Sequence, residues 1–292
     1  LAGQSNMEGQ GVVDLDHPEY YNGGKGTLEQ VIATTKSPER YAHLKNPDGT
    51  WRVRKDVFVR YRTPHELKKG GLSIGFAVYE GRHHIGPEFQ LGHLVGDAFE
   101  EPILLVKTAW GGKSLYKDFR PPSAGGTTGV FYKQMFQEVE EALSAIGEDF
   151  PKLAELEPRI DGFVWFQGWN DMFDSEARAE YADNLVHLVS DVRGAFKTPD
   201  LPIVIGELGN GGKSASKEML AIRSAQAFAA GRVRPVGSCS FVETHAFARP
   251  KENSPNVGHG HHWFGNAESY FLIGDALGRA LVGIVQASGG IV

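Results

Sequence analysis

Ile103-Leu-Leu-Val-Lys-Thr108 is a short run rich in branched apolar residues, and a helical pattern follows it at residues 131–146. Such a run suits a strand that is buried on both faces of a parallel sheet. The same order of a strand followed by a helix recurs along the chain. Further strand-like runs are 160–166, 201–205 and 236–242, and further helical patterns are 87–100, 175–196, 216–230 and 266–285. Strands that alternate with helices predict an α/β protein with a doubly wound, mostly parallel sheet.

Two long segments interrupt this alternation. Residues 12–80 are too long for a simple crossover, and the runs Trp51-Arg-Val-Arg54 and Val57-Phe-Val-Arg-Tyr-Arg62 predict a hairpin within them. Residues 244–262 form a loop rich in Pro, Gly, Asn and His. Both segments should fall at the carboxyl ends of strands, where open α/β sheets bind ligands. We therefore expect the functional site at that edge.

Composition excludes several classes of protein. The 292 residues carry a formal net charge of −6, spread along the chain, so the basic face that nucleic-acid binding requires is not expected. No apolar run approaches the ~20 residues of a membrane span, so no membrane partner is expected. Cys239 is the single cysteine, which excludes an intramolecular disulfide, and we expect it to be a buried structural thiol.

The first motif that carries chemistry is Gly3-Gln-Ser-Asn-Met-Glu-Gly9, directly after a strand stub at residues 1–2. A serine at a strand-to-helix turn can present its hydroxyl at the sheet edge. The alternative is an N-cap serine without catalytic function.

The second motif is Trp110-Gly-Gly-Lys-Ser114. Glycine lets the backbone approach a ligand closely. A phosphate-binding loop requires a further glycine, but Lys107 stands there, and Glu207 stands at the matching place before a second Gly-Gly-Lys-Ser at 211–214. Phosphate-loop chemistry is therefore not expected.

The third motif is Trp165-Phe-Gln-Gly-Trp-Asn-Asp171. The Asn170 amide can donate to a developing oxyanion, a contact typically worth ~3 kcal/mol of barrier. A plain turn would explain the same residues. The neighbouring tryptophans could stack against a carbohydrate or pack in the core, and the sequence favours neither alternative.

The fourth motif is Gly258-His-Gly-His-His-Trp-Phe-Gly-Asn-Ala-Glu268, before the last helix. A histidine there could reach back to Ser5 as a base. His259, His261 and His262 could instead wrap a zinc ion, or the loop could have no function. Serine, glycine, asparagine and histidine motifs occur in this order beside predicted strands, and this co-occurrence favours a shared site.

The order and wording of these motifs resemble the SGNH (GDSL-like) hydrolases, in the branch of carbohydrate esterase family six and the sialate O-acetylesterase-like domains. The matching blocks are Gly3 to Met7, the pair Gly111-Gly112, and Trp165 to Gly168. Where that branch has glutamate after its Gln-Gly pair, this chain has Trp169. The resemblance implies one domain over residues 1–292, with an insert at about 12–80, and a three-layer α/β/α sandwich of flavodoxin-like SGNH type.

The resemblance also implies a serine esterase that removes acetyl groups from a carbohydrate without a cofactor. Ser5 would be the nucleophile and His262 its base. The oxyanion hole would use the N–H groups of Ser5 and Gly112 and the Asn170 amide, with Gln167 as the alternative third donor. The expected substrate contacts are Gln4, Trp110, Trp169 and Trp263.

One departure from the family concerns the acid that orients the histidine. The aspartate often found three residues before the base is His259 here. Glu243 is the candidate carboxylate, and a backbone carbonyl that holds the imidazole is the alternative. His261 and His245 remain other possible bases. The missing acid also leaves two other functions open, a carbohydrate-binding protein that has lost catalysis and a metal-dependent hydrolase on the histidine loop.

The compartment and the oligomeric state are not visible in the sequence. The chain begins with Leu1 and enters a motif at once, so we expect residues before it, as a removed signal peptide or a trimmed end. The family resemblance favours a secreted or periplasmic location.

Overall fold

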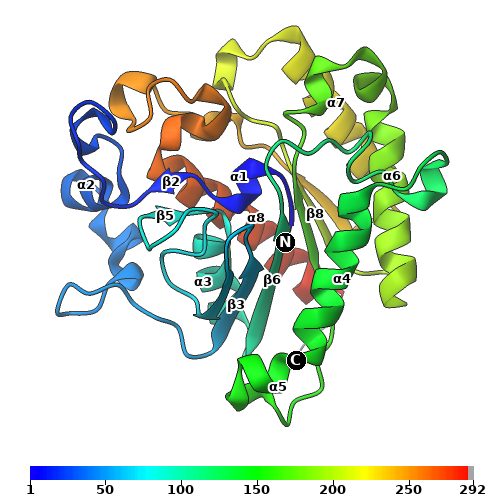
Figure 1. Cartoon of the computed structure of the whole chain (residues 1–292), viewed down its shortest axis with the longest axis horizontal. Helices are drawn as coiled ribbons and strands as arrows, with labels where there is room; N and C mark the ends of the chain where they lie inside the picture. The colour runs from blue at the N-terminus through cyan, green and yellow to red at the C-terminus, as the bar shows by residue number, and fades with distance from the viewer. Residues whose placement is uncertain (289–292) are drawn as a thin grey trace.

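A computed structural model describes residues 1–288 and contains a seven-stranded sheet with the strand order β4-β3-β6-β1-β7-β8-β9 (Figure 1). All neighbouring strands are parallel except β3 and β4. The strands are β1 (Ala2–Gly3), β3 (Val57–Arg62), β4 (Leu67–Gly71), β6 (Ile103–Ala109), β7 (Phe163–Phe166), β8 (Ile203–Gly206) and β9 (Cys239–Val242). A separate pair joins β2 (Gly11–Val12) to β5 (His84–Ile85).

Helices cover both faces of the sheet and make three layers. Figure 1 shows α4 and α6 on one side of the sheet and α3 on the other. The helices are α1 (Ser5–Glu8), α2 (Leu28–Thr34), α3 (Glu88–Ala98), α4 (Val130–Ser144), α5 (Ile146–Asp149), α6 (Ser175–Phe196), α7 (Lys217–Arg232) and α8 (Ala267–Ala287). The predicted doubly wound α/β sandwich is confirmed, and the predicted main helices and strands lie within a few residues of their expected bounds.

Alternation along each central strand divides the core into two clusters. In β7, Val164 and Phe166 join the cluster under α3 and α8, whereas Phe163 and Trp165 join the cluster under α4, α6 and α7. Successive side chains of a strand point to opposite faces, so a strand covered on both sides must be apolar throughout. This explains the continuous apolar runs in the sequence.

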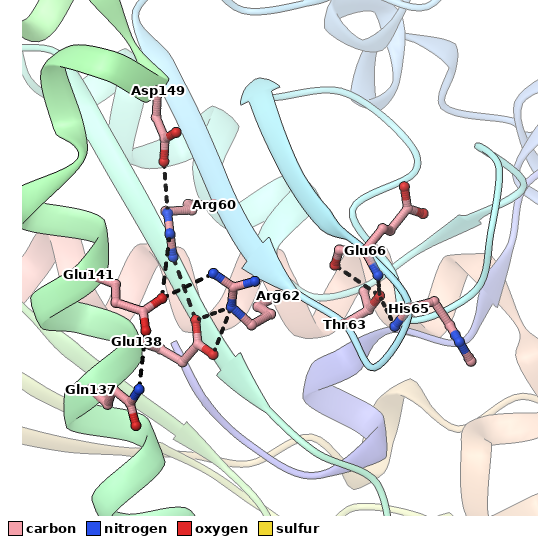
Figure 2. Close-up of polar contacts among 9 residues, drawn as sticks. All are labelled: Arg60, Arg62, Thr63, His65, Glu66, Gln137, Glu138, Glu141 and Asp149. Carbon is pink, nitrogen blue, oxygen red and sulfur yellow. Dashed lines mark hydrogen bonds and ion pairs between the residues drawn. The ribbon is translucent and has the colours of Figure 1, made fainter.

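The long insert adds an edge hairpin to the sheet, but with a different partner from the predicted one. Strand β3 pairs with β4, and residues 51–54 form no strand, since Trp51 only bridges Lys45. The chain reverses at Thr63, whose hydroxyl accepts hydrogen bonds from the N–H groups of His65 and Glu66 (Figure 2). Such a local side-chain hydrogen bond stabilises a tight turn. This turn brings the strand that follows it, β4, alongside β3.

A buried ion-pair network attaches this hairpin to α4 and α5. Arg60 on β3 is 4% exposed and lies 2.9 Å from Asp149 and 3.5 Å from Glu138 (Figure 2). Arg62 pairs with Glu138 and Glu141, and Lys69 on β4 pairs with Asp149. The basic residues that alternate with apolar ones in β3 therefore face these two helices.

Helix α8 corrects the prediction that the chain has no segment apolar enough to span a membrane. By length and composition alone its 21 residues could cross a bilayer. However, Tyr270, Phe271, Ile273 and Leu277 are buried in the core cluster against α3 and the sheet. The apolar character of α8 is accounted for by this packing.

Cys239 is half-buried at the start of β9 and is a free thiol. Burial raises its pKa to about 12, so it is an unreactive thiol at neutral pH.

Candidate active site

Ser5 begins the short helix α1 at the carboxyl end of β1, the central strand of the sheet. The turn before it is tight: a Cβ atom added to Gly3 would lie 2.1 Å from the carbonyl oxygen of Phe166, so only glycine fits there. Ser5 is 9% exposed. The serine hydroxyl is thus carried by a constrained strand-to-helix turn between β6 and β7.

Gln4 connects the serine turn to the loop after β7. Its side-chain oxygen Oε1 accepts from the N–H groups of Gly168 at 3.2 Å and Asn170 at 3.4 Å, and its Nε2 donates to Asn170 Oδ1 at 3.2 Å. Gln4 is only 2% exposed. Gln4 therefore holds the loop that carries Asn170.

The glycine loop after β6 lies directly beside Ser5. A Cβ atom added to Gly111 would lie 3.7 Å from Ser5 Cβ and 3.1 Å from Glu8 Oε2, and Asn170 Nδ2 donates to the carbonyl oxygen of Gly112 at 2.9 Å. Gly112 has a positive φ of 72° and is exposed. These contacts bring the first three motifs of the sequence together at one edge of the sheet.

Glu8 is a buried carboxyl group behind the serine. Burial raises its pKa, while the Gly111 N–H and the Lys107 ammonium act in the opposite direction. Lys107 itself is fully buried and paired with Glu88 at 2.7 Å. Lys107 also donates to the backbone carbonyl oxygen of Glu8, the last residue of α1, at 2.8 Å, and so ties the serine turn to β6.

Gln167, the alternative oxyanion donor, has both amide hydrogens engaged. Its Nε2 donates to the carbonyl oxygen of Lys113 at 3.0 Å and to Asp171 Oδ2 at 2.6 Å. Its Oε1 accepts from Tyr181 at 2.9 Å. Asp171 also accepts from the N–H groups of Leu115 and Tyr116, and burial raises its pKa to about 6. Gln167 thus holds the loop together with both of its amide hydrogens, whereas Asn170 Nδ2 makes one such bond, to the Gly112 carbonyl oxygen.

The histidine loop is tied to the serine turn through its backbone. Asn6 Nδ2 donates to the carbonyl oxygen of His261 at 3.1 Å, and Asn210 Nδ2 donates to the same oxygen at 3.0 Å. Tyr270 donates to Asn6 Oδ1 at 2.7 Å and to the His262 carbonyl oxygen at 3.4 Å. The fourth motif therefore joins the other three.

The backbone after His262 bends sharply. Trp263 and Phe264 have φ values of 53° and 54°, in the left-handed region that bulky residues seldom adopt. Such strain costs of order 1–3 kcal/mol per residue and persists only where surrounding contacts enforce it. Here Trp263 is buried in the core, which holds the bend.

His262 is surrounded by other histidines rather than by carboxylates. Burial is the main cause that lowers its pKa to about 3, and the nearby His261 and His259 lower it further. The rings of His261 and His262 are 4.0 Å apart. His262 is therefore neutral at neutral pH, and it makes no side-chain hydrogen bond with any group in residues 1–288, Ser5 included.

Glu243, the expected orienting acid, is not brought to His262. It is exposed at the end of β9, and no ion pair or hydrogen bond joins it to the imidazole within the part of the chain that is described. The orienting carboxylate expected from the sequence does not lie at this position.

A carboxylate–histidine pair does occur at the same edge, between Glu207 and His245. Glu207 follows β8, is 4% exposed, and lies 2.9 Å from His245 Nδ1. The same carboxylate accepts from the N–H groups of Thr244 at 2.7 Å and His245 at 2.8 Å. No motif in the sequence predicted this pair, although an acidic residue directly after a buried strand could have indicated it.

The metal alternative gains no support from the geometry. Among residues 1–288, no group of three or more His, Cys, Asp or Glu side chains is arranged to hold a metal ion. The ring of His259 lies 5.5 Å from that of His261 and 6.2 Å from that of His262.

Of the three tryptophans expected to contact substrate, two belong to the core. Trp110 is 8% exposed and packs against Phe119 and Phe131, and Trp263 is 2% exposed. Trp169 is half-buried at the site, with its ring 5.8 Å from that of His261. Phe173, which lies outside the sequence motifs, has its ring 6.0 Å from that of Trp169 and is 69% exposed.

Comparisons with known proteins agree with this geometry. A family model described as carbohydrate esterase, sialic acid-specific acetylesterase, matches residues 1–269. A probable carbohydrate esterase of Arabidopsis thaliana is 24% identical over 215 residues, which are 73% of this chain and 68% of that protein.

Two solved structures share the fold. The crystal structure of an Arabidopsis thaliana protein matches with a TM-score of 0.60 and 18% identity, over 97% of this chain and 96% of that chain. A carbohydrate acetylesterase from Xanthomonas citri matches with a TM-score of 0.59 and 12% identity, over 98% of this chain and 56% of that chain. Both likenesses confirm the fold that the motifs predict.

Proposed function

Because this chain belongs to the carbohydrate-esterase family of sialic acid-specific acetylesterases, and is therefore an esterase, we propose that it removes acetyl groups from a carbohydrate through an acyl-enzyme on Ser5. The observation that carries the serine mechanism is the convergence of four sequence motifs at one sheet edge. Gln4 and Asn170 link the serine, glycine and asparagine blocks, and Asn6 links the serine to the histidine loop.

In the first half of the reaction, Ser5 Oγ attacks the acetyl carbonyl carbon while His262 takes the hydroxyl proton. The negative charge that develops on the carbonyl oxygen is stabilised by the N–H groups of Ser5 and Gly112 and by the Asn170 amide. The carbon–oxygen bond to the sugar then breaks, and the proton on His262 passes to the leaving sugar oxygen. The products are a free sugar hydroxyl and acetyl-Ser5.

In the second half, water attacks the acetyl-Ser5 carbonyl while His262 accepts one of its protons. The bond to Ser5 Oγ breaks, the proton returns to Ser5, and acetic acid leaves. Each step moves one proton between His262 and an oxygen, and the proposed mechanism uses no metal or organic cofactor.

We further propose that Ser5 and His262 work as a dyad without an orienting carboxylate. The exposed position of Glu243 supports this, and so does the finding that no carboxylate in residues 1–288 makes a hydrogen bond to the His262 imidazole. A neutral imidazole can accept the proton of Ser5. The contacts that hold the His261 and His262 carbonyl groups fix the backbone that carries the base relative to the serine turn.

The nucleophile is tested by the turnover of 4-nitrophenyl acetate with purified wild type, Ser5→Ala and the matched control Ser175→Ala, an exposed serine on α6. We expect wild type and Ser175→Ala to be equally active, Ser5→Ala to be inactive, and EDTA to have no effect. Activity that EDTA abolishes and zinc restores would refute the serine mechanism. An inactive wild type that still binds sugar would favour a binding protein.

The base is tested by comparing two neighbouring histidines. His262→Ala should lose nearly all activity, whereas His261→Ala should keep most of it. The reverse ranking would overturn the assignment of His262.

A further inference from the structure

Trp169 and Phe173 form an aromatic pair at the rim of the proposed site. Their rings lie 6.0 Å apart and nearly perpendicular, at 71°, and Phe173 is 69% exposed. In the free protein most of the Phe173 ring is in contact with water, so a ligand that covers the ring gains the free energy of burying its apolar area.

The turn that carries Phe173 is anchored from both sides. Asp171 is 0% exposed and accepts from the N–H groups of Leu115 and Tyr116, and Met172 is 6% exposed in the core. On the far side Asp174 caps helix α6 by accepting from the N–H groups of Glu176 and Ala177. With its neighbours held in this way, the Phe173 ring is presented to solvent on a rigid turn.

The aromatic pair is continuous with the reacting groups. The Trp169 ring lies 5.8 Å from that of His261, the neighbour of the proposed base. Asn170, the proposed oxyanion donor, stands between Trp169 and the anchored turn, and its backbone N–H is held by Gln4. A molecule with its ester at Ser5 could therefore extend across both rings.

We propose that Trp169 and Phe173 form a subsite for a sugar ring next to the acetylated one, so that the substrate class is acetylated oligosaccharide rather than acetylated monosaccharide. The apolar C–H face of a pyranose matches an aromatic face, and large rings with few rotatable bonds supply such contact area at little entropic cost. This subsite rests on the proposed esterase function. In this proposal, Trp169 binds a sugar ring at the position where the branch of the SGNH hydrolases that this chain resembles has glutamate.

The test compares kcat/KM for acetylated xylo-oligosaccharides with kcat/KM for ethyl acetate, which has no ring to stack. The variants are Phe173→Ala, Phe173→Tyr and the matched control Phe228→Ala, a phenylalanine 62% exposed on α7. For Phe173→Ala we expect the ratio of the two kcat/KM values to fall about tenfold, mainly through KM, as suits the loss of one aromatic contact. Phe173→Tyr should restore the ratio, and Phe228→Ala should match wild type.

A ratio for Phe173→Ala equal to that of Phe228→Ala would overturn the subsite while leaving the esterase intact. A second measurement separates the two proposals. Binding of unacetylated xylo-oligosaccharides to Ser5→Ala, followed by titration calorimetry, should weaken about tenfold with the added Phe173→Ala. If wild type has no esterase activity but this binding loss is found, the proposed function fails and the sugar subsite stands. Equal binding with and without Phe173 refutes the subsite.

Discussion

The Asn6 side chain joins the serine turn to the histidine loop: its Nδ2 donates to the His261 carbonyl oxygen at 3.1 Å, and its Oδ1 accepts from Tyr270 at 2.7 Å. Asn6 directly follows Ser5 and is 4% exposed. Because Tyr270 also donates to the His262 carbonyl oxygen, two side chains set the position of the histidine loop relative to the serine turn.

Replacement of Asn6 should therefore reduce kcat more than it changes KM. For Asn6→Ala we expect kcat to fall roughly 10- to 100-fold, because a shift of about 1 Å between reacting groups can cost that much. Tyr270→Phe keeps the ring and removes only the hydroxyl, so its loss should be smaller. Steady-state kinetics, with circular dichroism to verify folding, provide the measurement. An unchanged kcat in folded Asn6→Ala would show that the link is not needed.

Much of this arrangement follows from the sequence by simple rules. Parallel strands buried on both faces must be apolar throughout, so β6, β7 and β8 are visible as runs. Their carboxyl ends share one edge, which predicts that Ser5, Gly112 and Asn170 meet there. Capping residues such as Asp174 explain why the bounds of α6 agree with the pattern.

Other features depend on contacts that are distant in sequence. Residues 51–54 alternate like a strand, yet a local turn at Thr63 pairs β3 with β4. Tryptophans such as Trp110 and Trp263 are typical of sugar-binding sites. Only the folded structure shows that both side chains are buried in the core. Whether Glu243 or Glu207 contacts a histidine depends on which loops lie side by side in the fold. No local sequence pattern predicts this.

The low pKa of His262 predicts an unusual pH profile. The base must be neutral to act, and its pKa of about 3 means that it stays neutral on acidification to pH 5. An ordinary histidine with a pKa of about 6.5 would lose roughly 30-fold in kcat/KM between neutral pH and pH 5. About 1% of a base with a pKa of about 3 is protonated at pH 5, so we expect kcat/KM for ethyl acetate to change by less than threefold over this range.

The control for this profile is the folded fraction at each pH, followed by circular dichroism. Burial also lowers the pKa values of His84 and His93, to about 4 and 3. Unfolding therefore takes up protons at these sites below about pH 6.5, and this part of the stability is lost as the pH falls. A fall in kcat/KM centred near pH 6.5 in fully folded protein would contradict the buried, neutral His262.

The Glu207–His245 pair should serve stability rather than catalysis. Glu207→Gln keeps the shape but leaves fewer acceptors for two backbone N–H groups and an imidazole, so the free energy of unfolding should fall by about 2–3 kcal/mol. Urea unfolding gives this value, and His245→Ala should retain most esterase activity. If His245→Ala instead abolishes turnover while His262→Ala does not, the carboxylate-paired histidine is the base.

The Arg60 network predicts a stability effect that is independent of the active site. Arg60→Met removes the guanidinium between Glu138 and Asp149, which are 7% and 5% exposed in their side chains. Breaking a buried pair from one side typically costs 3–5 kcal/mol, and the remaining partners Arg62 and Lys69 place our expectation near ~3 kcal/mol. Urea unfolding measures the loss.

The matched control is Arg159→Met, because Arg159 pairs with Asp161 at 2.6 Å with side chains 65% and 44% exposed. An exposed pair contributes ~0–1 kcal/mol, so this variant should unfold almost like wild type.

Burial already raises the pKa of Glu138, so without Arg60 this carboxyl should take up a proton more readily. The deficit of Arg60→Met should therefore shrink as the pH falls, and Arg60→Met/Glu138→Gln should recover part of it at neutral pH. Equal losses for Arg60→Met and Arg159→Met would mean that burial adds nothing to this network.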